Sequence, residues 1–181
     1  AQAYAFAFAK RFKAQLHLVH VVDTAYASYA GVYGFGAEVE THIEDVKKSA
    51  QEGLAAICDL ARAQGIDAHP HLLQGRPAEE TVGKAKQSGC DLLVTGTHGR
   101  SGVDHFLFGS TAERMVRYSE VPVLAVKPVE REFVRGEGAF TLKRILCPCD
   151  LSPLSEQAVT LAANVCRVFG AELVLLHVID S

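Results

Sequence analysis

Several features that mark other protein classes are missing from this chain. No apolar run reaches the roughly 18 residues that a membrane-spanning helix needs, and the opening residues 1–4 show no basic segment leading into an apolar core. The 18 Lys and Arg residues are scattered along the sequence, and the net charge is only −3. We therefore expect a cytoplasmic protein whose partners are neither membranes nor nucleic acids.

The sequence also lacks the cysteine spacing of a disulfide scaffold. Its cysteines are odd in number, which fits free thiols in a reducing compartment; they are Cys58, Cys90, Cys147, Cys149 and Cys166. Only Cys147 and Cys149 are close together, and they fall in a strand-like run. At this pair we favour structural cysteines over a metal or redox site.

The most informative stretch runs from residue 92 to residue 113. The apolar run 92–94 predicts the end of a buried strand, and Ser110 opens a segment with helical periodicity. Gly96, Gly99 and Gly109 lie between them, where glycine permits positive φ and close approach of the backbone. Free N–H groups near the positive end of a helix dipole favour a phosphate, and Ser110 could both cap the helix and donate to a phosphate oxygen. The alternative is a turn that needs glycine only for tight geometry.

Other side chains in this stretch have two interpretations each. His98 and Arg100 could face a triphosphate, as a hydrogen-bond donor and as a charge partner, or could simply be exposed to solvent. The apolar run 106–108 is more typical of a packing patch than of a platform for stacking a base.

The sequence offers little support for rapid catalysis. It has no glycine-lysine-serine phosphate loop and no Ser-Gly-Gly pyrophosphatase-type loop, and no paired carboxylates lie near Gly96, Gly99 and Gly109. Asp104 is the only acid between Gly99 and Gly109, and one carboxylate favours a metal contact only weakly. The residues therefore indicate binding without fast turnover.

Periodicity predicts alternating helices and strands, which is typical of an α/β domain with a parallel sheet. Pro122 near the start of the last strand of this series favours a sheet edge, and the glycine- and aromatic-containing segment 24–37 is expected to be a loop. Helices are expected at 1–13, with an apolar stripe of Tyr4, Phe8 and Phe12, and at 38–64, 77–88 and 110–118; strands are expected at 16–22, 66–73, 90–95 and 121–126.

The end of the chain repeats its beginning. Residues 14–24 align with 171–181 at an offset of 157, and six of the eleven positions are identical. A charged linker at 128–142 precedes a strand at 144–150, a helix capped by Ser152, and the repeated strand. We interpret residues 1–127 as one repeat without its first strand, and 143–181 as the start of a second repeat, in a piece of a longer two-repeat protein.

The loop and three flanking strands resemble the universal stress protein family, in its ATP-binding branch. The loop has two glycines three residues apart, a nine-residue spacer and a Gly-Ser pair, and the strands end at residues 23, 150 and 180. The resemblance covers essentially the whole chain and implies a five-stranded parallel sheet in the order 3-2-1-4-5, with the ligand at the carboxyl ends of the strands. Residues 144–150 could supply the missing first strand, within one chain or in a homodimer or strand-swapped oligomer.

The resemblance also implies a site for ATP, with Mg²⁺ as a companion ion. Gly96 would admit the ribose, and backbone groups around Gly109 would hold the phosphates. The full set of implied binding residues is Val21, Thr95, Gly96, His98, Gly99, Arg100, Gly109, Ser110, Thr111, Pro148, Asp150 and Val178. Three functions stay open: a stress-response or signalling module that binds ATP, a slow ATPase, and an interaction scaffold that binds no nucleotide.

Overall fold

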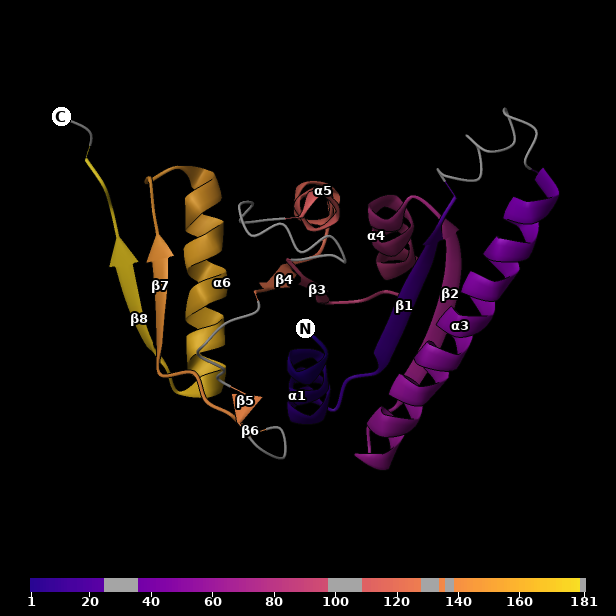
Figure 1. Ribbon diagram of the computed structural model, residues 1–181. Coiled ribbons are helices and arrows are strands. Elements are labelled where there is room, and N and C mark those ends of the chain that lie inside the picture. The colour runs from indigo at the N-terminus through magenta and orange to yellow at the C-terminus, as the bar shows by residue number, and fades with distance from the viewer. Residues whose placement is uncertain (25–35, 98–108, 128–133, 136–138, 180–181) are drawn as a thin grey trace. The chain divides into compact units, whose positions relative to one another are not determined.

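A computed structural model describes residues 1–24, 36–97, 109–127, 134–135 and 139–179 (Figure 1). These residues form two compact units, Ala1–Glu130 and Arg131–Ser181, and each unit is described by itself. A search of the described helices finds none with the length and apolar character needed to cross a membrane.

The first unit alternates helices and strands, as the sequence predicts. Along the chain come α1 (Gln2–Phe12), β1 (Leu16–Asp23), α3 (Gly36–Ala63), β2 (Ala68–Gly75), α4 (Pro77–Gln87), β3 (Leu93–Gly96), α5 (Ser110–Tyr118) and β4 (Val123–Val126). Strand β2 begins two residues later than expected, because the Ile66 N–H bonds back to the Ala61 carbonyl at 3.1 Å and closes the end of α3. Residues 25–35, most of the predicted loop, lie outside the described part.

The strands of this unit form two parallel pairs. β1 pairs with β2 from Leu16 opposite Ala68 to Asp23 opposite Gly75, and β3 pairs with β4 from Leu93 opposite Val123 onward. The parallel α/β architecture is thus confirmed. The pairs match neighbours 2–3 and 4–5 of the expected order, but they are separate two-stranded sheets, so the five-stranded order stays a prediction.

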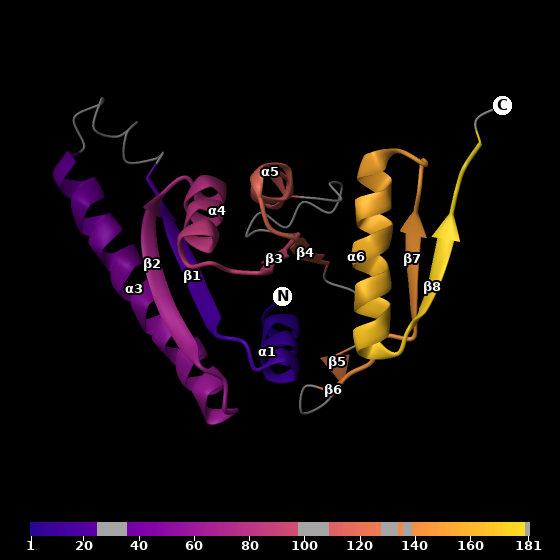
Figure 2. The same ribbon diagram turned by 180° about the vertical axis from the view of Figure 1, so that it is seen from behind.

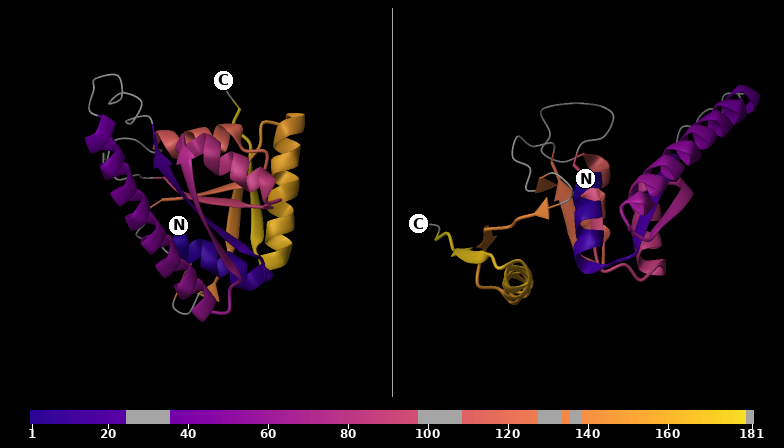
Figure 3. Two further views of the ribbon diagram at one scale, coloured as in Figure 1. Left: turned by 90° about the vertical axis from the view of Figure 1, so that its right-hand side faces the viewer. Right: turned by 90° about the horizontal axis from the view of Figure 1, so that it is seen from below.

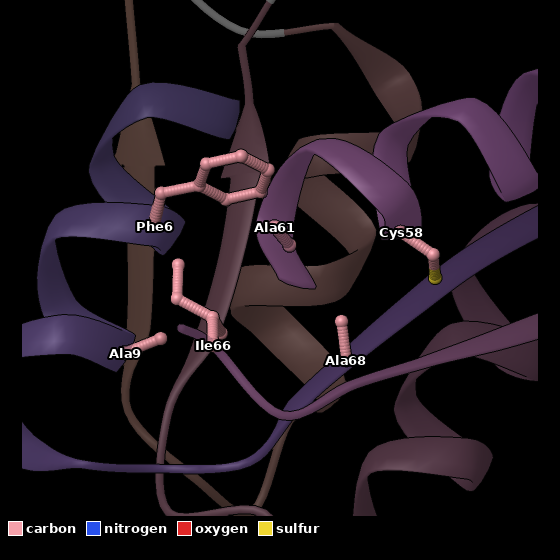
Figure 4. Packing of buried hydrophobic residues seen from close by; sticks show 6 residues of the cluster. All are labelled: Phe6, Ala9, Cys58, Ala61, Ile66 and Ala68. Atoms are coloured by element: carbon pink, nitrogen blue, oxygen red, sulfur yellow. The ribbon is translucent and has the colours of Figure 1, made fainter. Parts of the chain in front are cut away.

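Helices α3 and α4 cover opposite faces of the β1–β2 pair (Figures 1 and 2). On the α3 side, Leu16 and Leu18 pack against a buried cluster that α1 completes. Figure 4 shows the members of this cluster, Phe6, Ala9, Cys58, Ala61, Ile66 and Ala68. The other face meets α4, whose residues Ala78 and Ala85 form a second cluster with Leu93 of β3 and Met115 of α5.

The inward face of α1 differs from the apolar stripe expected at Tyr4, Phe8 and Phe12. Tyr4 is buried, but Phe12 is 48% exposed, and its ring stacks on that of Phe8 with centroids 5.8 Å apart. The buried positions include Phe6 and the small residues Ala7 and Ala9. Small side chains let α1 approach its neighbours closely, which large-residue periodicity does not reveal.

The second unit contains the predicted strand-helix-strand segment. Strands β7 (Arg144–Pro148) and β8 (Glu172–Leu176) are parallel and are joined by α6 (Pro153–Phe169), as the ribbon in Figure 3 also shows. The Ser152 hydroxyl accepts the Ser155 N–H at 3.2 Å, which confirms the predicted cap. Part of the predicted linker forms a small antiparallel pair, β5 (Val134–Arg135) with β6 (Ala139–Phe140).

Candidate functional site

The two ends of the glycine-containing loop are held together by backbone hydrogen bonds. The Gly109 N–H donates to the Thr97 carbonyl at 2.7 Å, and the Thr97 N–H donates to the Val126 carbonyl of β4 at 3.0 Å. Thr97 is 1% exposed, so this junction is sheltered from solvent. The end of β3, the end of β4 and the start of α5 therefore meet at one place, as the strand-loop-helix interpretation requires.

Helix α5 begins differently from the prediction. Its N-cap is Gly109, in an extended conformation with φ −68° and ψ 148°, and Ser110 is the first helical residue. The expectation that Ser110 is the cap is therefore wrong, and Gly109 does not adopt the positive φ that glycine permits. The Gly109 N–H donates to the Thr97 carbonyl, and this hydrogen bond holds the backbone extended at Gly109. The helix cap therefore lies one residue before Ser110, which carries the hydroxyl.

The first turn of α5 retains the chemistry of an anion site. The first intrahelical hydrogen bond runs from the Glu113 N–H to the Gly109 carbonyl, so the N–H groups of Ser110 and Thr111 precede the helical ladder. Both residues are exposed. The Glu113 carboxylate is paired with Arg117 at 3.1 Å, which lessens its repulsion of an incoming anion.

Some predicted site residues lie outside the described part of the chain. These are His98, Gly99 and Arg100, together with Asp104 and the apolar run 106–108. Thr95 and Gly96 are the last residues of β3, and the Thr95 hydroxyl donates to the Gly96 carbonyl at 3.3 Å. Val21 lies near the end of β1, opposite Leu73, and so in the other strand pair.

The remaining predicted residues belong to the second unit. Pro148 ends β7, Asp150 follows it, and Val178 comes after β8 and is 71% exposed. The Asp150 carboxylate accepts the Ser152 N–H at 2.9 Å. Hydrogen bonds from the Ser152 side chain, then from its backbone, lower the pKa of Asp150 to about 2.

The link between Asp150 and the start of α6 was missed from the sequence. From the sequence we expect Asp150 only as a ligand contact, whereas its side chain also organises the turn in which Leu151 has φ 64°. The Asp-x-Ser spacing before Pro153 is the available signal, because a short carboxylate commonly bonds the backbone two residues onward.

Histidine, cysteine and acidic side chains could also act as ligands of a metal ion, and cysteines as reactive thiols. Within the described ranges, no group of three or more His, Cys, Asp or Glu side chains is placed to hold a metal ion. All five cysteines are free thiols, and Cys147 is buried whereas Cys149 is half-buried. The Cys149 sulfur lies 3.6 Å from the Ser155 hydroxyl, a local contact within the turn that precedes α6.

Comparisons with known proteins agree on one family. The model of the universal stress protein family matches residues 1–127 and 141–181. Universal stress protein MJ0531 of Methanocaldococcus jannaschii is 35% identical over 132 residues, covering 73% of this chain and 76% of that protein.

Solved structures show a similar fold. The protein MJ0577 aligns at a TM-score of 0.59 and 27% identity, over 70% of this chain and 88% of that one. A universal stress protein from Archaeoglobus fulgidus aligns at a TM-score of 0.74 and 22% identity, over 99% of this chain but 61% of its own. Two others, described as complexes with cAMP and with dAMP, align at TM-scores of 0.47 and 0.48, too low for their ligands to bear on this chain.

Proposed function

The chain belongs to the universal stress protein family, and we propose that it is a stress-response or signalling module that binds an adenine nucleotide, ATP, at the loop between β3 and α5. The observation that carries this proposal is the 2.7 Å bond between the Gly109 N–H and the Thr97 carbonyl. It joins the first turn of α5 to the end of β3, so that N–H groups without intrahelical partners adjoin a loop rich in glycine.

Each residue near this loop has a proposed role. The N–H groups of Ser110 and Thr111 would bind phosphate oxygens, with the Ser110 hydroxyl as a further donor. Gly96 and Gly99 would let the ribose and the phosphates approach the backbone. His98 and Arg100 would complement the negative charge, and Mg²⁺ would arrive with the triphosphate.

The adenine contacts would come from the strand ends. Val21 would line the base pocket in the first repeat, and Val178 is its equivalent in the second. Asp150, with Pro148 before it, would meet the adenine or ribose of a site that includes the first strand of a repeat. The Asp150 carboxylate is ionised at neutral pH, so that it can accept a hydrogen bond from a ribose hydroxyl.

We also propose a tandem organisation. Residues 1–127 would form one repeat and 143–181 the start of another, a division supported by the 11-residue repeat and by a longer relative of which this chain covers 61%. Strand β7 would occupy the first-strand position of a sheet, in its own chain or in a homodimer or strand-swapped oligomer.

Binding of ATP can be tested by calorimetric titration of the wild-type chain and two variants at position 109. Gly109→Asp places a carboxylate beside the phosphates and is expected to weaken affinity by at least about tenfold, or 1.4 kcal/mol. Gly109→Asn is the control, because Asn has nearly the same shape and also suits an N-cap. Both fit the backbone, since φ of −68° suits any residue.

The outcomes separate the three functions. A loss of affinity in Gly109→Asp but not in Gly109→Asn supports the phosphate contact, whereas equal affinities contradict it. Steady phosphate release that depends on Asp104 or His98 would favour the slow ATPase. Failure of saturating ATP to raise the melting temperature would favour the scaffold.

A further inference from the structure

Three histidines gather on one face of the β1–β2 pair. His17 lies opposite His69 in the parallel register, and His71 is the next residue of β2 on the same face. The His17 ring stacks on both others, with centroids 5.3 Å from His69 and 5.2 Å from His71. Its Nδ1 lies 2.9 Å from Nε2 of His71, which is hydrogen-bond distance.

This contact limits how many protons the pair can hold. One ring nitrogen must donate and the other must accept, so at least one of the two imidazoles has to be neutral. A second proton would turn both facing nitrogens into donors and break the bond. Stacked, half-buried rings would also repel one another once charged.

The surroundings oppose protonation further. Burial is the main reason that the pKa values of His17 and His71 are lowered, and the positive charges of Lys84 on α4 and of neighbouring histidines add to this. Asp67 acts the other way on His17, and its carboxylate lies 3.0 Å from Nε2 of His69. The opposite face of the strands meets α1 and α3 through an apolar cluster, so the charged groups acting on the two rings come from β1, β2, the turn before β2, and α4.

We propose that His17, His69 and His71 form a pH-sensitive latch that holds α4 on the β1–β2 pair and releases it on mild acidification. In the neutral cluster, His17 and His71 are hydrogen-bonded and the rings are stacked. When both of these rings are protonated, their hydrogen bond is broken and their two positive charges act against the Lys84 ammonium. Since α4 also packs against β3 and α5 through Ala78, Ala85 and Met115, its release would loosen the packing of β3 and α5.

The direction of the effect follows from linkage. A histidine whose pKa is lower in the folded state stabilises the fold at a pH above its unfolded value of 6.5. As the pH falls below 6.5, the histidines bind more protons in the unfolded or released state than in the latched state. The latched state therefore becomes less stable relative to the other two. Carboxylates stay ionised in this range, which leaves histidine as the responding group.

Hydrogen exchange of the full chain tests the latch, with a chelator present to remove metal ions. Between about pH 7.5 and about pH 5.5, after correction for intrinsic exchange, protection of the α4 amides is expected to fall about tenfold. Protection of α6 in the second unit is expected to stay unchanged. Equal protection of α4 at the two pH values would overturn the proposal.

Two variants assign the effect to the cluster. His71→Gln removes one titrating ring but keeps a polar group beside His17, and it is expected to abolish most of the pH dependence. His20→Gln is the control on the same strand, because residue 20 alternates to the opposite face from His17. If His71→Gln fails to fold, His17→Gln takes its place. Wild-type pH dependence in a folded cluster variant contradicts the latch.

Discussion

Strands β1 and β8 belong to similar sequence segments in different surroundings. The repeated segment is identical at six of eleven positions, yet Val22 is 5% exposed and its equivalent Ile179 is 82% exposed. Likewise, Leu18 packs against the cluster of α1 and α3, whereas the equivalent Leu175 is 55% exposed.

The difference lies in what the rest of each unit supplies. β1 has β2 as a partner and helices on both faces, and it extends to Asp23. β8 has β7 and α6 and ends at Leu176, four residues before the position equivalent to Asp23. The apolar pattern is therefore sufficient for a strand, but burial and strand length depend on the other elements of the unit.

The largest expected effect on the free energy of unfolding comes from placing a carboxylate at Val22, compared with the same change at the equivalent Ile179. Val22→Asp would place an unpaired carboxylate in the core and should lower the free energy of unfolding by about 3 kcal/mol or more. Ile179→Asp adds the same group to an exposed position and should change it by less than about 0.5 kcal/mol. Urea unfolding followed by circular dichroism measures both. Similar losses in the two variants would show that the two strands are equally buried.

A smaller effect is expected at the helix ends that precede the two strands. Lys13 and Gly170 are equivalent, and both are left-handed, with φ 52° and 65°. Because a side chain is strained there, Lys13→Gly should stabilise the first unit by about 0.5–1 kcal/mol, and Gly170→Lys should destabilise the second by about 1 kcal/mol. Thermal unfolding checks the opposite signs. Changes of the same sign would mean that the two helix ends differ in conformation.

The smallest expected effect is the pH dependence of stability that Asp150 gives to the second unit. Since its pKa is lowered from 3.8 to about 2, its contribution is complete above pH 3.8 and is lost as the pH falls toward 2. Ser152→Ala removes the hydroxyl hydrogen bond and should raise this pKa toward 3.8. Carboxyl-carbon NMR titration follows it directly, and an unchanged midpoint in the variant would exclude the Ser152 hydroxyl, though not its backbone N–H, as a cause.

Local signals in the sequence predicted much of the fold. The bounds of α5, the Ser152 cap and the parallel strand pairs follow from periodicity, capping residues and apolar runs. Contacts between distant segments were not predictable in this way. The bond between His17 and His71 joins residues 54 apart, and the Gly109 contact that displaces Ser110 from the cap depends on where β3 meets α5.

The most direct test of the nucleotide site compares the two helix starts by amide NMR during an ATP titration. We expect the amides of Ser110 and Thr111 at the start of α5 to shift with saturable dependence on ATP. The Ser155 amide of α6 serves as the internal reference, because it already donates to the Ser152 hydroxyl. It is expected to shift less than those two amides. If ATP leaves the Ser110 and Thr111 amides unshifted, the proposed phosphate site is wrong.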